Sequence, residues 1–140
     1  MSFTTDLEKT FLDSNILIYL LDQDKLKKEK VTLLLDPTFT ISTQVVAENI
    51  NVCLKKLKLT KEKAFDHGNF LLTKFNVIAI EKAFFPIAFQ IAIKYQLSFW
   101  DSLILASALQ SDCTQFYSED MQHGLVIEGK LKIINPFKIL

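Results

Sequence analysis

Residues 10–17 read Thr-Phe-Leu-Asp-Ser-Asn-Ile-Leu, a short apolar run that meets an aspartate and then becomes apolar again. Thr10 to Asp13 predicts a strand, and Ser14 to Leu21 predicts a helix that begins directly after it. A strand followed at once by a helix is typical of βαβ folds, in which Asp13 would stand at the carboxyl end of the first strand.

The rest of the chain repeats this alternation. Further strands are expected at Phe39 to Ser42, Asn76 to Ile80 and Thr114 to Tyr117, with a possible fifth at Leu131 to Ile134. Helices are expected at Lys25 to Leu35, Thr43 to Lys58, Thr60 to Phe75, Pro86 to Tyr95 and Trp100 to Gln110. Gly68 is expected to weaken its helix. This order predicts an α/β fold, a three-layer α/β/α sandwich with a central, mostly parallel sheet.

The composition limits the classes of protein to consider. The chain has 140 residues, 49% of them hydrophobic, which suits one domain over residues 1–140. Sixteen acidic residues balance sixteen basic ones, so no overall field attracts the protein to nucleic acid or membrane. Every basic residue is a lysine, which disfavours a reader of duplex DNA, where arginine on guanine is the commonest specific contact.

The cysteines and the N-terminus predict a cytoplasmic protein. Cys53 and Cys113 are far apart and have no metal-binding spacing, so we expect buried, reduced thiols. Met1 to Thr10 is polar and is not a signal peptide. The longest apolar stretches are shorter than a membrane span, so no membrane contact is expected.

Four acidic residues fall where a parallel sheet would gather them. Asp13 ends the first strand, and Asp120 lies just past the fourth. Glu48 is near the start of the helix after the second strand, and Asp101 opens the helix that leads into the fourth strand. Because sites form beyond the carboxyl ends of parallel strands, all four are expected at one edge.

Each acid also has a purely structural explanation. Asp13 can cap the first helix, Asp101 follows Ser98 at the capping-box spacing, and Asp120 can belong to an ordinary polar turn. Glu48 lies roughly opposite the apolar stripe of its helix, as a solvated surface residue would, unless that side faces a cleft.

The clustering of the four acids favours a metal site over the separate structural explanations, because four adjacent carboxylates repel one another unless a cation lies among them. Oxygen-only ligands suit Mg²⁺ or Mn²⁺. His67 and His123 are isolated, the first expected on a helix surface and the second in a loop. No glycine-rich loop follows the first strand, which argues against a nucleotide-binding domain. A phosphoacceptor receiver domain would carry a pair of acidic residues near the end of the first strand. Here Thr10, Phe11 and Leu12 precede Asp13, so the sequence disfavours that class of protein.

These residues together resemble the PIN-domain family, and within it the VapC-type toxins of bacterial toxin–antitoxin modules. The resemblance covers most of the chain. It rests on Phe11-Leu12-Asp13-Ser14-Asn15-Ile16-Leu17, the glutamate of Ser42-Thr43-Gln44-Val45-Val46-Ala47-Glu48, the segment Ser98 to Ala108 around Asp101, and Tyr117-Ser118-Glu119-Asp120.

The resemblance implies a fold, an activity and partners. It implies adjacent first and fourth strands and a catalytic metal site of Asp13, Glu48, Asp101 and Asp120, with Mg²⁺ or Mn²⁺ bound. Ser14, Asn15 and Ser118 would orient those carboxylates. The implied reaction is cleavage of single-stranded or loop RNA by in-line attack of a metal-activated water. A cognate antitoxin and a homodimer are implied as well, and the alternative is an inactive PIN-like module that binds RNA or protein.

Several other features have open roles. Glu119 is either a peripheral ligand or merely exposed. The cluster of Lys55, Lys56, Lys58, Lys61 and Lys63 is more simply a solvated helix end than an RNA track. Phe99 and Trp100 could stack on a base, and Phe84, Phe85 and Phe89 could line a groove or a dimer interface, but core packing is the simpler expectation for each.

Overall fold

The computed structural model describes residues 8–139. Most of the polar N-terminal segment, from Met1 to Leu7, lies outside the described residues, as does Leu140. Within the described part, no helix is long and apolar enough to cross a membrane.

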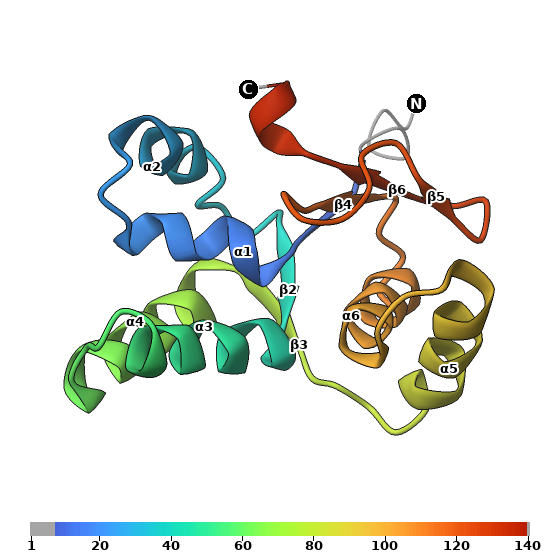
Figure 1. Cartoon of the computed structure of the whole chain (residues 1–140), viewed down its shortest axis with the longest axis horizontal. Coiled ribbons are helices and arrows are strands. Elements are labelled where there is room, and N and C mark those ends of the chain that lie inside the picture. The colour runs from blue at the N-terminus through green and yellow to red at the C-terminus, as the bar shows by residue number, and fades with distance from the viewer. Residues whose placement is uncertain (1–7, 140) are drawn as a thin grey trace.

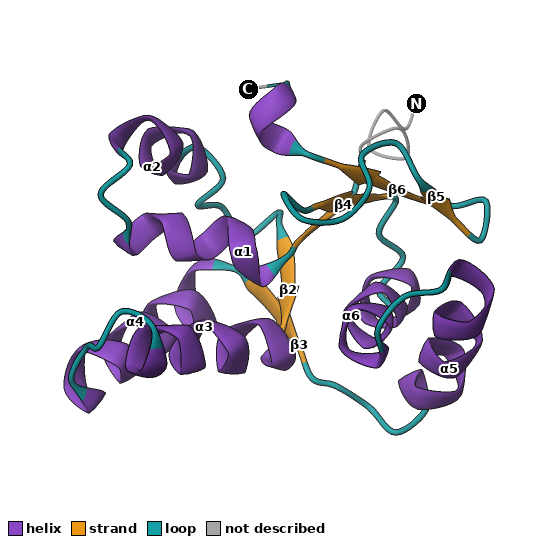
Figure 2. Ribbon diagram, in the orientation of Figure 1, coloured by secondary structure: helices purple, strands orange, loops and turns teal. Residues whose placement is uncertain are grey.

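A six-stranded sheet runs through residues 8–139 in the order β3-β2-β1-β4-β6-β5. Its strands are β1 (Thr10–Leu12), β2 (Thr40–Ser42), β3 (Asn76–Ile78), β4 (Gln115–Tyr117), β5 (Val126–Ile127) and β6 (Leu131–Ile134). Every neighbouring pair is parallel except β5 with β6. The predicted mostly parallel sheet is therefore confirmed (Figure 2).

Helices cover both faces of this sheet. They are α1 (Ser14–Leu17), the 3-10 turn η2 (Ile18–Leu21), α2 (Lys25–Thr32), α3 (Thr43–Lys55), α4 (Lys61–Lys74), α5 (Phe84–Tyr95), α6 (Phe99–Gln110) and the 3-10 turn η3 (Pro136–Lys138). The chain steps from β1 to β2 to β3 in one direction and then returns to β4 beyond β1. Because parallel crossovers are right-handed, α1 to α4 lie on one side and α5 and α6 on the other (Figure 1).

The strand order reverses between β1 and β4, which pair in parallel from Thr10 opposite Gln115 to Leu12 opposite Tyr117. Such a reversal opens a crevice beyond the carboxyl ends of the two strands. Asp13 directly follows β1, and Ser118 directly follows β4. The topology therefore places the two segments that carry the predicted site side by side.

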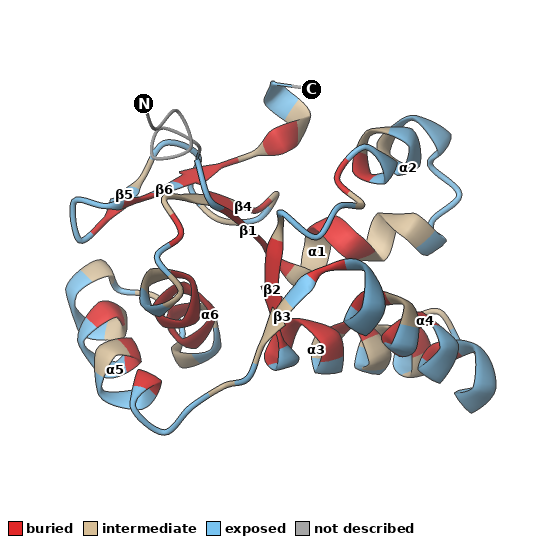
Figure 3. Cartoon of the chain, turned by 180° about the vertical axis from the view of Figure 1, so that it is seen from behind, coloured by how far each residue is buried: buried red, intermediate tan, exposed pale blue. Residues whose placement is uncertain are grey.

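The core lies on both faces of the central strands, which are buried (Figure 3). Phe11 of β1 and Phe116 of β4 are fully buried, and their rings stack with centroids 5.4 Å apart and planes within 6° of parallel. Helix α6 is buried from Ser102 to Ala108, as its apolar pattern predicts. The hydroxyls of Ser102 and Ser107 donate to carbonyl oxygens one turn earlier in α6, which satisfies them inside the core.

Two features of the fold were not expected from the sequence. The antiparallel hairpin of β5 and β6 was missed because β5 has only two residues, too few for a periodic pattern. Gly68 does not simply weaken α4. A Cβ atom at this position would stand 2.9 Å from Ile50 Cδ1, so the glycine allows α4 to approach α3 closely.

Candidate active site

The four predicted carboxylates line one hollow of about 620 Å³. Asp13 enters it from the end of β1, Glu48 from α3, Asp101 from the first turn of α6, and Asp120 from the loop after β4. Ser14 and Asn15 of α1 line it as well. The structure thus brings together residues that are separated by up to 107 positions in the sequence.

Asp13 is the most enclosed of the four acids, with only 5% of its surface exposed. The Ser14 backbone N–H donates to Asp13 Oδ1 at 2.7 Å, and the Ser118 hydroxyl donates to Oδ2 at 2.9 Å. Burial raises the pKa of Asp13 to about 7, against the hydrogen bonds from Ser118 and Ser14, and the neighbouring Glu48 and Asp101 raise it further. The ionised carboxylate is therefore held in an unfavourable environment.

Asn15 joins the two ends of the site. Its Nδ2 lies 3.3 Å from Asp13 Oδ2, 3.1 Å from Asp120 Oδ2 and 3.3 Å from Ser118 Oγ. Its Oδ1 accepts from the Glu119 backbone N–H at 3.2 Å. One amide side chain therefore fixes the loop after β4 relative to the end of β1.

Glu48 faces the hollow, so the helix side opposite the apolar stripe lines a cleft and is not simply solvated. The Ser14 hydroxyl donates to Glu48 Oε1 at 2.9 Å and lies 3.5 Å from Asp13 Oδ1. Ser14 thus links the carboxylates of β1 and α3. The three residues expected to orient the acids all contact them, although their role in holding a metal stays a prediction.

Asp101 is not the cap of its helix. Ser98 caps α6, and its hydroxyl accepts from the Asp101 backbone N–H at 3.1 Å. The Asp101 side chain is half-buried, and burial raises its pKa, which Ser98 lowers and the charge of Asp120 raises. Asp120 itself is exposed. Ser98 and Asp101 thus form the backbone bond expected from the capping-box spacing, and the Asp101 carboxylate also lines the hollow.

The donor set fits a hard divalent cation. It consists of carboxylate oxygens, which Mg²⁺ and Mn²⁺ prefer. None of the four acids forms an ion pair with any described residue. Within residues 8–139, however, no three histidine, cysteine, aspartate or glutamate side chains gather closely enough to share one ion. Binding an ion would require the carboxylates that line the hollow to move closer together.

Glu119 belongs to a different set of contacts. Its carboxylate pairs with Lys27 of α2 at 2.5 Å and accepts from the Tyr19 hydroxyl at 2.6 Å. Lys27 also lies over the rings of Tyr19 and Phe137. Glu119 is therefore neither an extra ligand nor merely exposed, because it ties the loop after β4 to α2 and η2.

Two buried amide residues near Glu48 were missed from the sequence. Gln44 Nε2 lies 3.3 Å from Glu48 Oε2, and Asn49 Nδ2 donates to the Ser14 carbonyl at 3.1 Å. Asn49 Oδ1 contacts His67 Nε2 at 2.9 Å. His67 is buried, so the expectation that it lies on a helix surface was wrong. Asn49 could have been found as an amide among the apolar residues of α3, whereas Gln44 lies on the side of Glu48 and has no such signal.

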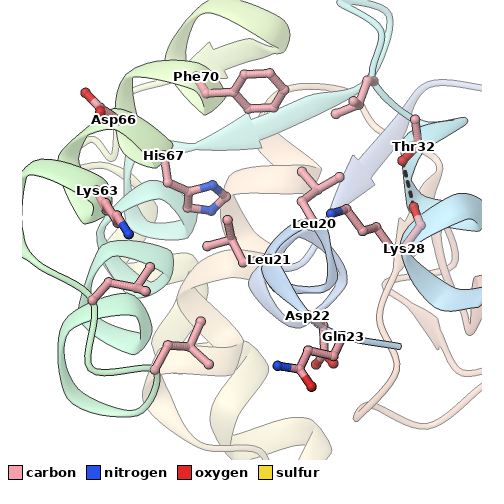
Figure 4. A pocket seen from close by; sticks show the side chains of 13 residues that line it. Leu20, Leu21, Asp22, Gln23, Lys28, Thr32, Lys63, Asp66, His67 and Phe70 are labelled. Atoms are coloured by element: carbon pink, nitrogen blue, oxygen red, sulfur yellow. Dashed lines mark hydrogen bonds between the residues drawn. The ribbon is translucent and has the colours of Figure 1, made fainter. Parts of the chain in front are cut away.

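A larger hollow, of about 950 Å³, lies away from the acids, between η2 and α2 on one side and α4 with the segment before it on the other. Its lining is mainly apolar and comes from Leu20, Leu21, Leu35, Leu57, Leu59 and Phe70. Figure 4 shows His67 pointing into it from α4, with Lys28 across from it on α2. The larger of the two hollows is therefore not the one that contains the four carboxylates, and the candidate active site is chosen by its side chains and not by its volume.

An aromatic surface on α5 and α6 corrects another expectation. Trp100 is 62% exposed, and Phe85 and Phe89 are exposed as well, so only Phe84 of the α5 phenylalanines considered lies in the core. Phe99 is half-buried, and its ring lies 5.3–5.9 Å from those of Trp100, Phe85 and Phe89. We call these residues, with Ile93 of α5, the aromatic surface.

The raised pKa of Asp13 predicts the pH dependence of stability without metal. Between its ordinary value near 3.8 and about 7, the folded protein keeps a proton that the unfolded chain has released. The free energy of unfolding should therefore fall as the pH rises through this range. Urea unfolding in EDTA should show higher stability at pH 5 than at pH 8, and a cation held by the ionised acids would reverse this order. A profile that rises with pH in EDTA would contradict the prediction.

The fold and the site define a three-layer α/β/α domain with carboxylates at the switch point of a parallel sheet. Residues 10–124 match the sequence model of the family described as PIN domain. The match spans most of the chain, and the chain belongs to the PIN domain family. No curated protein matches it by sequence.

Solved structures with the same fold include members of toxin–antitoxin systems. A toxin–antitoxin complex from Klebsiella pneumoniae has 24% identity, a TM-score of 0.67, and coverage of 91% of this chain and 97% of its own. VapC20 from Mycobacterium tuberculosis, described as a sarcin–ricin loop cleaving toxin, has 15% identity, a TM-score of 0.66, and coverage of 79% and 89%. DNA-bound VapBC from Salmonella typhimurium has 16% identity, a TM-score of 0.67, and coverage of 91% and 98%.

Proposed function

We propose that this chain, as a single PIN domain over residues 1–140, is a toxin of a toxin–antitoxin system. It acts as an endoribonuclease that depends on Mg²⁺ or Mn²⁺ and cleaves single-stranded or loop RNA in the cytoplasm. The observation that carries the proposal is the set of four carboxylates lining one hollow without a basic partner in the described residues. Family membership and the likeness to VapC structures support it.

Asp13, Glu48, Asp101 and Asp120 would hold the cation. When bound, a divalent ion polarises water and stabilises negative charge on a phosphoryl group under attack. The protein orients the carboxylates through hydrogen bonds. Ser118 donates to one oxygen of Asp13, Ser14 links Asp13 to Glu48, and Asn15 links Asp13 to Asp120. These bonds reduce the freedom that four mutually repelling side chains would otherwise have.

The substrate would be held by lysine, since the chain has no arginine. Lys56 is the member of the lysine cluster of residues 55–63 that lines the hollow with the acids. It is exposed at the end of α3, where it can reach a phosphate oxygen as a single point charge. A strand held in this way would be gripped by its backbone and not read base by base.

The proposed partners fit two surfaces. A cognate antitoxin would bury apolar side chains, and the 950 Å³ hollow offers an apolar lining for such a segment. The aromatic surface suits a homodimer, because Phe85, Phe89, Ile93 and Trp100 expose adjacent apolar side chains. The likeness to solved toxin–antitoxin complexes supports the first of these partners.

The alternative is an inactive PIN-like module that binds RNA or protein. A binding module could use Asp13 only as the cap of α1, a role that an uncharged asparagine or serine would fill without the cost of burying an ionisable carboxyl group. This cost favours an enzyme, in which a bound cation compensates for it.

Cleavage of a labelled single-stranded RNA in Mn²⁺ tests the function, with Asp120→Asn and Glu119→Gln as a matched pair from one loop. Asp120→Asn should lower the rate more than about 100-fold, since loss of an outer partner of a metal ligand alone costs about 10–100-fold. Glu119→Gln should stay within a few-fold of wild type, because Glu119 pairs with Lys27 instead. Absence of cleavage by wild type would favour the binding module, and equal cleavage by all three proteins would show that the reaction does not depend on Asp120.

A further inference from the structure

The side chain of Gln44 lies between two elements that carry acids. Gln44 stands one helical turn before Glu48 in α3 and is 8% exposed. Its Nε2 lies 3.3 Å from Glu48 Oε2 and 3.1 Å from the Trp100 carbonyl oxygen. Because Trp100 directly precedes Asp101, one amide joins the Glu48 carboxylate to the first turn of α6.

The orientation of this amide follows from its neighbours. A carboxylate and a carbonyl are acceptors only, so the nitrogen of Gln44 must face them. Gln44 Oε1 is then buried without a protein donor, the one buried side-chain nitrogen or oxygen atom in this situation within residues 8–139. An unsatisfied buried acceptor destabilises a fold, whereas an apolar residue of similar size would not carry that cost. The amide is therefore poorly explained as core filling.

We infer that Gln44 is a positioning residue for the Glu48 carboxylate, an inference that rests on the proposed function. The two oxygens of Glu48 have separate donors, Oε1 the Ser14 hydroxyl at 2.9 Å and Oε2 the Gln44 amide. Together these bonds fix a long, flexible side chain toward the hollow. The bond to the Trp100 carbonyl also ties α3 to the first turn of α6, next to Asp101.

The test compares Mn²⁺ affinity, measured by isothermal titration calorimetry, in Gln44→Met and Gln44→Leu. Each variant fills the same volume without a donor, and the pair allows for one that folds poorly. We expect Mn²⁺ to bind about 10–100-fold more weakly than to wild type, the usual effect of losing a group that orients a metal ligand. Gln90→Met, the same change on the exposed surface of α5, should leave the affinity unchanged.

The same substitutions in a Glu48→Ala background separate positioning from a general structural effect. If Gln44 acts through Glu48, Gln44→Met should cause no further loss of Mn²⁺ affinity in that background. An equal loss in both backgrounds, or no loss in either, would overturn the inference while the proposed function stood. A wild-type protein that neither binds Mn²⁺ nor cleaves RNA would instead overturn the proposed function, and the inference with it.

Discussion

Asp13→Asn should abolish Mn²⁺-dependent RNA cleavage and, at the same time, make the metal-free protein harder to unfold. The loss of cleavage should exceed about 100-fold, for the reason given for Asp120. The gain in stability comes from removing a charge that burial disfavours. A pKa of about 7 in place of 3.8 corresponds to an upper limit on the order of 4 kcal/mol at pH 8.

Asparagine is the right replacement because its Oδ1 can accept from the Ser14 backbone N–H while its Nδ2 donates to the Ser118 hydroxyl oxygen, so the change is mainly one of charge. Urea unfolding in EDTA at pH 8 and cleavage assays in Mn²⁺ give the two measurements. Asp66→Asn, an aspartate exposed on α4, should change neither. An Asp13→Asn protein that is no more stable than wild type in EDTA and still cleaves RNA would leave Asp13 only its role as the cap of α1, which asparagine fills equally well.

Phe116→Ala should lower the free energy of unfolding by about 3–5 kcal/mol, the typical cost of emptying a buried phenylalanine site. Phe116 is fully buried and stacks on Phe11, its direct partner across β1 and β4. Such a loss is a large part of the roughly 5–15 kcal/mol that stabilises an average domain. The midpoint of urea unfolding should fall sharply, with the slope of the transition unchanged.

Phe89→Ala provides the comparison, because Phe89 is 52% exposed on α5. Its replacement should cost much less than that of Phe116 in the monomer, since most of its ring is already in contact with water. If both substitutions proved equally mild, the stacked pair would not be the centre of the core.

The strand and helix order could be read from the sequence because each element carries its own pattern. Asp13 follows a buried apolar strand, and α6 is apolar on all sides, so the sequence predicted both correctly. The burial of the aromatic side chains could not be predicted in this way. Phe84 and Phe85 are neighbours with the same side chain, yet only Phe84 is buried, and this depends on how α5 packs against α6.

The contacts that organise the site could be predicted only in part. Ser14, Asn15 and Ser118 were expected near the acids because they neighbour Asp13 or Asp120 in sequence. Gln44 and His67 depend on tertiary contacts, since their partners, the Trp100 carbonyl and Asn49, lie on other helices. A side chain whose partner comes from a distant segment leaves no local periodicity by which to recognise it.

The pairing of β1 with β4 has a consequence for a protein made on a ribosome. The partners Thr10 and Gln115 are 105 positions apart, so the two strands cannot meet until most of the chain has been synthesised. An unfinished chain that ends before β4 would contain Asp13, Glu48 and Asp101 but would lack Ser118, Asp120 and the neighbouring strand. Because domains fold as units once their distant segments can pair, the proposed nuclease activity should appear only when translation is nearly complete, and truncated products should lack it.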